Sequence, residues 1–182
     1  MIVLKTSNGR VLHRQEGELV GANLRGLKLS GVDLSDQTMA RADFTGAVLN
    51  SACFDDADAR EAVFDDANME GALAFSANFD GASLQRTDLY WAIVSQASFR
   101  GANLSAAELM GANLNECDFI GAVLVDANLG RDNLGGSTKV EGANFSGADI
   151  NGVNWEGALY DANTVFPRGF DAAKHGLILQ PT

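Results

Sequence analysis

The sequence predicts an all-β solenoid, a column of about seven four-sided coils, and two observations support this fold class. A large apolar residue recurs at every fifth position from Leu24 to Leu134, and again from Val140 to Tyr160. A small residue, usually alanine, stands two positions before most of these centres. The chain therefore repeats one short structural unit along most of its 182 residues.

A period of five fits neither a straight helix nor a straight strand. On an α-helix, successive centres would lie about 140° apart and would spread around the axis. On a strand, an odd period would send successive centres to opposite faces. Burial of every centre requires the chain to turn the same corner in each unit. Four right-angle corners close a square, so a 20-residue coil rises by one strand spacing, about 4.8 Å.

The number of centres supports this geometry. Steps of five from 24 to 134 give 23 centres, and the second series brings the total to 28, or four walls of seven. The single extra residue before Val140 is expected at a corner, next to Gly135, Gly136 and Ser137. One predicted inward column is Leu24, Phe44, Phe64, Leu84, Leu104, Leu124 and Phe145, and a second is Met39, Ala59, Phe79, Phe99, Phe119, Val140 and Tyr160.

Several units also have closely similar sequences. Gly21–Arg25, Gly101–Ser105 and Gly111–Asn115 read GANLR, GANLS and GANLN. They resemble the A(D/N)LXX unit of pentapeptide-repeat proteins, and the resemblance covers roughly residues 21 to 161. It implies a right-handed quadrilateral β-helix. The segment Tyr160–Asp171 also resembles the ending of many bacterial members.

The two ends are expected to cover the exposed edges of the column. Residues 1–20 are predicted to form an N-terminal β-hairpin cap, because Asn8-Gly9 lies between two apolar stretches. Residues 21–161 form the repeat domain. Residues 162–182 form a C-terminal cap or tail, in which Asp171 precedes a single helical turn that Gly176 ends. The apolar residues of this tail either fold over the last coil or form an end-to-end homodimer contact: Phe166, Phe170, Leu177, Ile178 and Leu179.

The sequence carries no constellation typical of an enzyme. Its two histidines, His13 and His175, lie at opposite ends of the predicted column, so neither a catalytic nor a metal site is expected, and no cofactor. Cys117 is predicted to face inward and Cys53 outward on another wall, which excludes a disulfide and fits a reducing compartment. No apolar run is long enough to span a membrane and no signal peptide is recognised, so a cytoplasmic protein is expected.

An apolar patch is predicted on the outer surface of coils three to five. Outward positions of the third wall carry Leu73 and Ile93, and the adjacent corner carries Tyr90, Trp91 and Met110. Polar residues fill the same positions elsewhere, and exposed apolar patches with aromatic residues often mark partner contacts. The alternative is that Trp91 and Tyr90 lie flat along the corner and shield the backbone.

An acidic patch is predicted at the corner between the third and fourth walls of this chain, whose net charge is −11. At the next corner Arg60, Asp80 and Arg100 alternate, which indicates structural ion pairs of small individual value. The acidic corner shows no such alternation, so it is the better candidate for binding a basic partner. The acidic patch consists of Asp36, Asp55, Asp56, Asp58, Glu116 and Asp118.

Three functional hypotheses follow. The first is a rigid non-enzymatic scaffold that binds an unidentified protein partner. The second comes from the resemblance: a DNA mimic that binds DNA gyrase or topoisomerase IV, both type II topoisomerases, and protects them from fluoroquinolones or toxins. The predicted rod of roughly 34 Å is close to one DNA turn, but a net charge of −11 is only about half that of such DNA. The third, also from the resemblance, is a bacterial developmental or signalling regulator. None of the three requires direct nucleic-acid or membrane binding.

Overall fold

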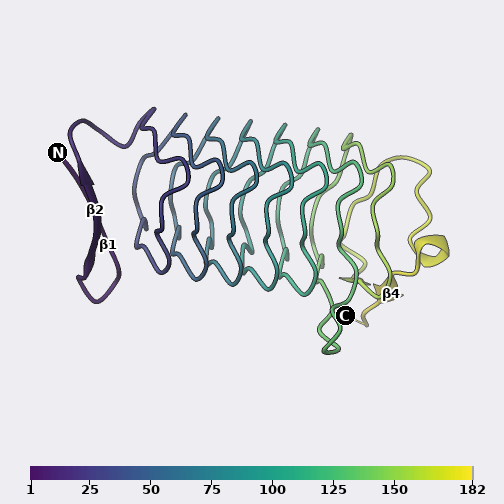
Figure 1. Ribbon diagram of the computed structural model, residues 1–182. Coiled ribbons are helices and arrows are strands. Elements are labelled where there is room, and N and C mark those ends of the chain that lie inside the picture. Colours follow the sequence, from purple (N-terminus) through teal and green to yellow (C-terminus); the bar gives the residue numbers. More distant parts are fainter. Residues whose placement is uncertain (182) are drawn as a thin grey trace.

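The structure, a computed structural model, describes residues 1–181, so only Thr182 of the predicted tail lies outside it. The chain winds as a series of four-sided coils about one axis (Figure 1). Neighbouring coils are joined by single parallel bridges, one on each side, such as Asn23 to Asp43 and Lys28 to Val48. From the first of these bridges to that between Glu108 and Asn128, each pair is separated by 20 residues. The period of five therefore places a corner in every unit.

Four walls result, and we number them by their first inward residues, Leu24, Leu29, Leu34 and Met39. Wall 1 contains Leu24, Phe44, Phe64, Leu84, Leu104, Leu124 and Ile150, and wall 2 contains Leu29, Leu49, Met69, Leu89, Leu109, Leu129 and Trp155. Wall 3 contains Leu34, Phe54, Ala74, Val94, Leu114, Val140 and Tyr160, and wall 4 contains Met39, Ala59, Phe79, Phe99, Phe119, Phe145 and Phe166.

Phenylalanine rings form a continuous stack inside wall 4. The ring centroids of Phe79, Phe99, Phe119 and Phe145 are 5.1, 5.0 and 4.9 Å apart in succession, with planes within 6° of parallel. Phe166 extends the stack at 5.8 Å. These distances are close to the spacing of paired strands, so the backbone ladder sets the stacking distance.

The register makes one large change, where six residues leave the wall, and a second change of one residue between Asn144 and Val165, which pair at a separation of 21. Asn113 pairs with Lys139, a separation of 26 rather than 20, and the next three bridges keep the new separation. Residues 132–137 form the resulting loop, which projects from the column in green in Figure 1, and its Leu134 is 76% exposed. The prediction that Leu134 is an inward centre followed by one extra residue was therefore wrong. The two predicted columns were wrong at their upper ends for the same reason, because Phe145 belongs to wall 4 and Val140 and Tyr160 to wall 3.

The inward positions that precede the centres hold hydroxyl groups at three places. Thr87 and Thr164 donate hydrogen bonds to the carbonyl oxygens of Phe64 (2.8 Å) and Val140 (3.0 Å), one coil below. Thr138 occupies the equivalent position after the loop. Each hydroxyl is small enough for an alanine position and binds a carbonyl group there, so its burial leaves no unpaired polar group.

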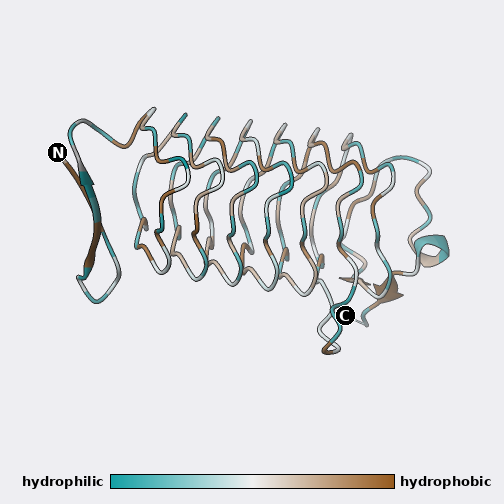
Figure 2. Cartoon of the chain, viewed as in Figure 1, coloured by the Kyte–Doolittle hydropathy of each residue, from teal (hydrophilic) through white to brown (hydrophobic). Residues whose placement is uncertain are grey.

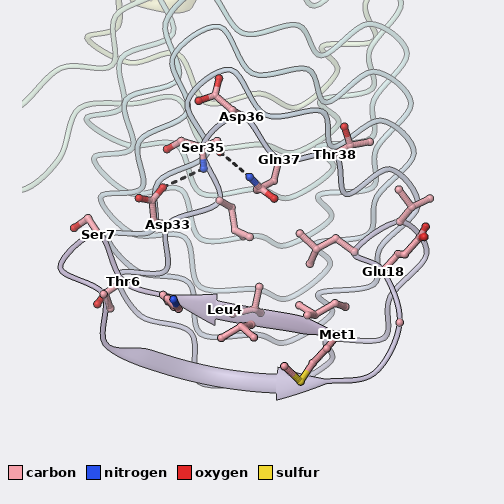
Figure 3. Close-up of a pocket in the computed structure, with 18 residues that line it drawn as sticks. Met1, Leu4, Thr6, Ser7, Glu18, Asp33, Ser35, Asp36, Gln37 and Thr38 are labelled. Atoms are coloured by element: carbon pink, nitrogen blue, oxygen red, sulfur yellow. Dashed lines mark hydrogen bonds between the residues drawn. The ribbon is translucent and has the colours of Figure 1, made fainter.

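At the N-terminus, β1 (Ile2–Lys5) pairs antiparallel with β2 (Val11–Gln15). Ile2 and Leu4 are buried, and the carbonyl oxygen of Lys5 accepts a hydrogen bond from Asp33 N (2.7 Å), which attaches the hairpin to wall 3. A cleft of about 920 Å³ separates β1 from the edge of the first coil at residues 33–38 (Figure 3). The hairpin therefore contacts the column along one side and stands away from it along another.

At the C-terminus, β3 (Leu159–Tyr160) pairs in parallel with β4 (Ile178–Leu179). Between them the 3₁₀ turn η1 (Ala173–His175) ends at Gly176, whose φ of 81° is left-handed. The Asp171 carboxylate accepts a hydrogen bond from Lys174 N (3.3 Å), although Ala172 is the residue at the N-cap.

The five apolar residues of the C-terminal tail have different exposures. Phe166 and Phe170 pack around the buried Trp155, and Leu177 is buried. Ile178 and Leu179 remain 41% and 58% exposed on β4, which is brown in Figure 2. An end-to-end homodimer through these two residues stays a prediction.

Candidate protein-binding surface

The predicted apolar patch divides between two walls. Leu73 and Ile93 lie on wall 3, in the same outward column as Cys53, and are 40% and 45% exposed. Phe75 lies on this wall too and is 44% exposed, although it is not among the residues predicted for the patch. The available signal was the triplet of residues 73–75, in which a small centre, Ala74, is flanked by two large apolar residues.

Tyr90 and Met110 lie around the corner, on the outer face of wall 2. Both are half-buried and line a hollow of about 380 Å³. The sequence placed these side chains in one patch with Leu73 and Ile93, because column positions alone do not show to which side a corner residue turns. The hollow is completed by Glu70, Asp88, Glu108 and Asn128.

Trp91 stands at the corner between these two surfaces. Its ring stacks on Tyr90, with centroids 5.3 Å apart and planes 10° from parallel. It lies over Gly111, where a Cβ atom would collide with the indole ring of Trp91, and the φ of +70° at Gly111 also favours glycine. Its indole N–H donates a hydrogen bond to Asp132. The structure therefore agrees with the alternative that Trp91 lies along the corner, although its side remains 46% exposed to solvent.

Asp132 joins the corner to the loop of residues 132–137. One carboxylate oxygen accepts from the backbone N–H groups of Leu134 (2.8 Å) and Gly136 (2.6 Å), and the other accepts from Trp91. Removal from water, the largest single effect, raises the pKa of Asp132, but the hydrogen bonds from Trp91, Gly136, Leu134 and Tyr90 together outweigh it and lower the pKa. We call this arrangement of Tyr90, Trp91 and Asp132 the corner clamp.

The clamp is expected to open in acid. Because the folded state lowers the pKa of Asp132, its contribution is present above the unfolded pKa, about 3.9, and is lost as pH falls through the lower folded value. Titration from pH 6 to pH 2.5 should therefore change Trp91 fluorescence only below about pH 4. Trp155, the other tryptophan, is fully buried on wall 2, one coil above Leu129, so Trp155→Phe leaves Trp91 as the remaining source of the signal. Asp132→Asn should remove the transition, and a transition of unchanged midpoint in that variant would contradict the assignment.

The Thr138 hydroxyl replaces a missing backbone hydrogen bond at the base of the loop. Its hydroxyl accepts from Gly111 N (3.0 Å) and lies 2.9 Å from the carbonyl oxygen of Gly130 and 3.0 Å from that of Leu109. In an uninterrupted coil the Gly111 N–H would reach the carbonyl of Gly130 directly, as Gly71 reaches Tyr90 (2.8 Å). The loop separates those two groups, and the buried hydroxyl connects them.

The predicted acidic patch is partly neutralised. Asp58 pairs with Arg60 (2.8 Å), and Asp118 pairs with Arg100 (2.5 Å). The hydrogen bond from Arg60 lowers the pKa of Asp58 despite its partial burial. The prediction that this corner lacks ion pairs was therefore wrong, because the side chains of Arg60 and Arg100 pair with carboxylates on wall 4 and not with Asp80. From Arg100, Asp80 accepts a hydrogen bond only through the backbone N–H (3.0 Å).

The remaining members of the acidic patch form no ion pair with an arginine of the described residues, and they take mainly structural roles. Asp55 accepts a hydrogen bond from Phe75 N (2.8 Å), and Glu116 accepts one from Gln96 (2.9 Å). Asp36, Asp56 and Glu116 occupy corners with a left-handed φ of 56–60°.

Residues 1–181 offer neither a cluster of metal ligands nor a membrane-spanning helix. No group of three histidine, cysteine or carboxylate side chains among them could hold a metal ion. No helix in this part of the chain is long and apolar enough to cross a membrane. His13 belongs to β2 and His175 to η1, at opposite ends of the column as predicted (Figure 1).

Known structures include several similar proteins. HetL, a pentapeptide-repeat protein involved in heterocyst differentiation regulation in the cyanobacterium Nostoc sp. strain PCC 7120, is 22% identical; the match covers 87% of this chain and 81% of HetL, with a TM-score of 0.34. QnrB1, a plasmid-mediated fluoroquinolone resistance protein, is 23% identical, with 88% and 79% covered and a TM-score of 0.48. A thylakoid-lumen protein of Arabidopsis thaliana is 34% identical over 58% of this chain and 67% of its own, with a TM-score of 0.27.

The repeat itself gives the assignment. No curated protein matches the chain at a significant level. The family model for pentapeptide repeats, in eight copies, matches residues 18–56, 52–90 and 97–134, which together are more than half of the chain. Proteins of this family fold as right-handed quadrilateral β-helices, in agreement with the four walls described above. The chain belongs to the pentapeptide-repeat family.

Proposed function

We propose that this protein is a rigid, non-enzymatic scaffold that binds another protein through wall 3. The column of seven coils, with the hairpin and the C-terminal turn as caps, supplies a stiff support. We propose that the protein acts in the cytoplasm, because Cys53 and Cys117 are free thiols, which reducing compartments maintain.

The observation that carries this proposal is the exposure of three large apolar side chains on wall 3. Leu73, Phe75 and Ile93 are each 40–45% exposed, although the repeat requires only the inward residues to be apolar. They come from two neighbouring coils, so the backbone ladder fixes their relative positions. Because the backbone is already fixed, binding at these residues needs little rearrangement of the chain, which favours a partner contact.

The test is a double substitution, Leu73→Ser with Ile93→Ser. We expect a bound partner to be lost from affinity purification while the circular dichroism spectrum stays unchanged, since both side chains point outward. The control is Val63→Ser with Val123→Ser, which alters two outward positions of wall 1. The proposal fails if quantitative mass spectrometry finds no protein that is lost from the Leu73→Ser, Ile93→Ser variant but still bound by the control variant. Trp91 is unsuitable for this test because it also holds the loop.

No specific observation in residues 1–181 favours the DNA-mimic or the signalling hypothesis. For DNA mimicry, the carboxylates should form an unpaired, evenly spaced series. Asp43, Asp58, Asp66 and Asp118 are instead each paired with an arginine. The scaffold is therefore the function that the described geometry supports best.

A further inference from the structure

The outer face of wall 2 differs from the other walls in its charges. Its hollow is lined by the carboxylates of Glu70, Asp88 and Glu108. The structure places an arginine against Asp43, Asp58, Asp66 and Asp118, on other parts of the surface, but shows no ion pair to the three carboxylates of this hollow among the described residues. The wall thus carries a local negative charge that the chain itself does not neutralise.

The same hollow contains an aromatic ring and a thioether. Tyr90 and Met110 occupy successive positions of one column, directly beside the column of Asp88 and Glu108. Because Trp91 covers one face of the Tyr90 ring, the ring is held in place and its other face is left for the hollow. An aromatic face attracts cations, and a methionine side chain adapts to the stem of a long side chain.

We infer that this hollow receives a basic side chain, lysine or arginine, from an extended segment of a partner protein. The inference rests on the proposed scaffold function and adds the chemistry of the partner. A long basic side chain satisfies both features at once, since its hydrocarbon stem packs on Met110 while its cationic head lies between the carboxylates and Tyr90. Asp88 and Glu108 are already oriented by hydrogen bonds, from Tyr90 N (3.0 Å) and from Asn128 (2.8 Å). An arginine-rich segment would therefore meet a site whose acceptors are largely fixed in advance.

The experiment uses the full chain with ¹³C-methyl methionine and a synthetic peptide, acetyl-Gly-Arg-Gly-Arg-Gly-amide. Of the four methionines, Met39 and Met69 are fully buried and Met1 lies in the N-terminal hairpin, so the Met110 methyl resonance reports on the hollow. We expect this resonance to shift saturably with the peptide, to shift less at high salt, and not to shift with the glutamine analogue of the peptide. No saturable shift of Met110, or an equal shift with the glutamine peptide, would overturn the inference.

Two sets of substitutions locate the binding. Glu70→Gln with Asp88→Asn and Glu108→Gln keeps the hydrogen-bond acceptors and removes the charge, and should weaken peptide binding by about tenfold or more. The matched control, Asp36→Asn with Asp56→Asn and Glu116→Gln, removes the same charge from the corner between walls 3 and 4, and should change binding by less than about twofold. Equal losses in both sets would show general attraction to an acidic protein and reject the site. If the peptide does not bind but the Leu73→Ser, Ile93→Ser protein still loses a partner, only the inference about the hollow is rejected. If the peptide binds but no partner depends on wall 3, only the proposed function is rejected.

Discussion

Phe99→Ala should lower the free energy of unfolding by about 3–5 kcal/mol. Phe99 is fully buried in wall 4, between the rings of Phe79 and Phe119 at 5.1 and 5.0 Å. The substitution removes two stacked contacts and leaves a cavity that the backbone ladder prevents from collapsing. Urea unfolding followed by circular dichroism measures the effect, which should appear as a lower midpoint.

The control for this prediction is Phe75→Ala, which removes the same side chain from the outer surface. Phe75 is 44% exposed, so its loss should change the unfolding free energy by less than about 0.5 kcal/mol. A Phe99→Ala protein within about 1 kcal/mol of the wild type would mean that the ring stack is not a main source of stability. Because each coil contacts only its neighbours, the substitution can destabilise one half of the column more than the other. In that case the two halves would unfold at different urea concentrations, and the unfolding curve would broaden.

Thr138→Val should cost about 2–3 kcal/mol, although the two side chains have nearly the same shape. The valine leaves the Gly111 N–H without its acceptor and the buried Gly130 carbonyl without its donor. Hydrogen exchange should show faster exchange of the Gly111 amide, and urea unfolding should give the loss of stability.

Thr87→Val is the matched control, because Thr87 fills the equivalent inward position in an uninterrupted coil. Its hydroxyl donates to Phe64 O, which also accepts from Ala67 N (2.9 Å), so the valine leaves no carbonyl without a donor. The expected cost is about 1 kcal/mol or less. Equal costs for Thr87→Val and Thr138→Val would contradict the role of Thr138 in connecting the ladder across the loop.

Most of the fold could be predicted from the sequence because each residue position has one fixed direction in a square coil. The period of five identified the inward residues of the first six coils, and the 20-residue spacing identified which of them stack. The error at Leu134 arose because Leu134 follows Leu129 by five residues and so continues the period, whereas the six-residue loop makes Val140 the next inward centre, eleven residues after Leu129. Asp132 was the missed signal, since an inward position two before a true centre would bury its carboxylate.

The candidate surface was less predictable, for a different physical reason. Sequence spacing places a residue on a wall or at a corner, which was sufficient for Leu73 and Ile93. It does not determine the rotamer of a long side chain, so it could not show which partners Trp91 and Arg60 would contact. Trp91 reaches Asp132, 41 residues away, only because the loop brings that carboxylate to the corner. Arg60 turns to Asp58, two residues back, where a column argument paired it with Asp80.

The 20-residue register has a consequence for how such a protein changes length. Tandem duplication of residues 81–100 would insert a whole turn whose first and last residues already match their new neighbours. The molecule would grow by about 4.8 Å without altering any existing pairing. A duplication that is not a multiple of 20 residues would rotate everything beyond it to a different side, unless the extra residues left the wall as a loop, as residues 132–137 do. Gene duplication can therefore lengthen this architecture only by whole coils. Two binding sites on one wall can be moved apart by one coil at a time while they keep their orientation.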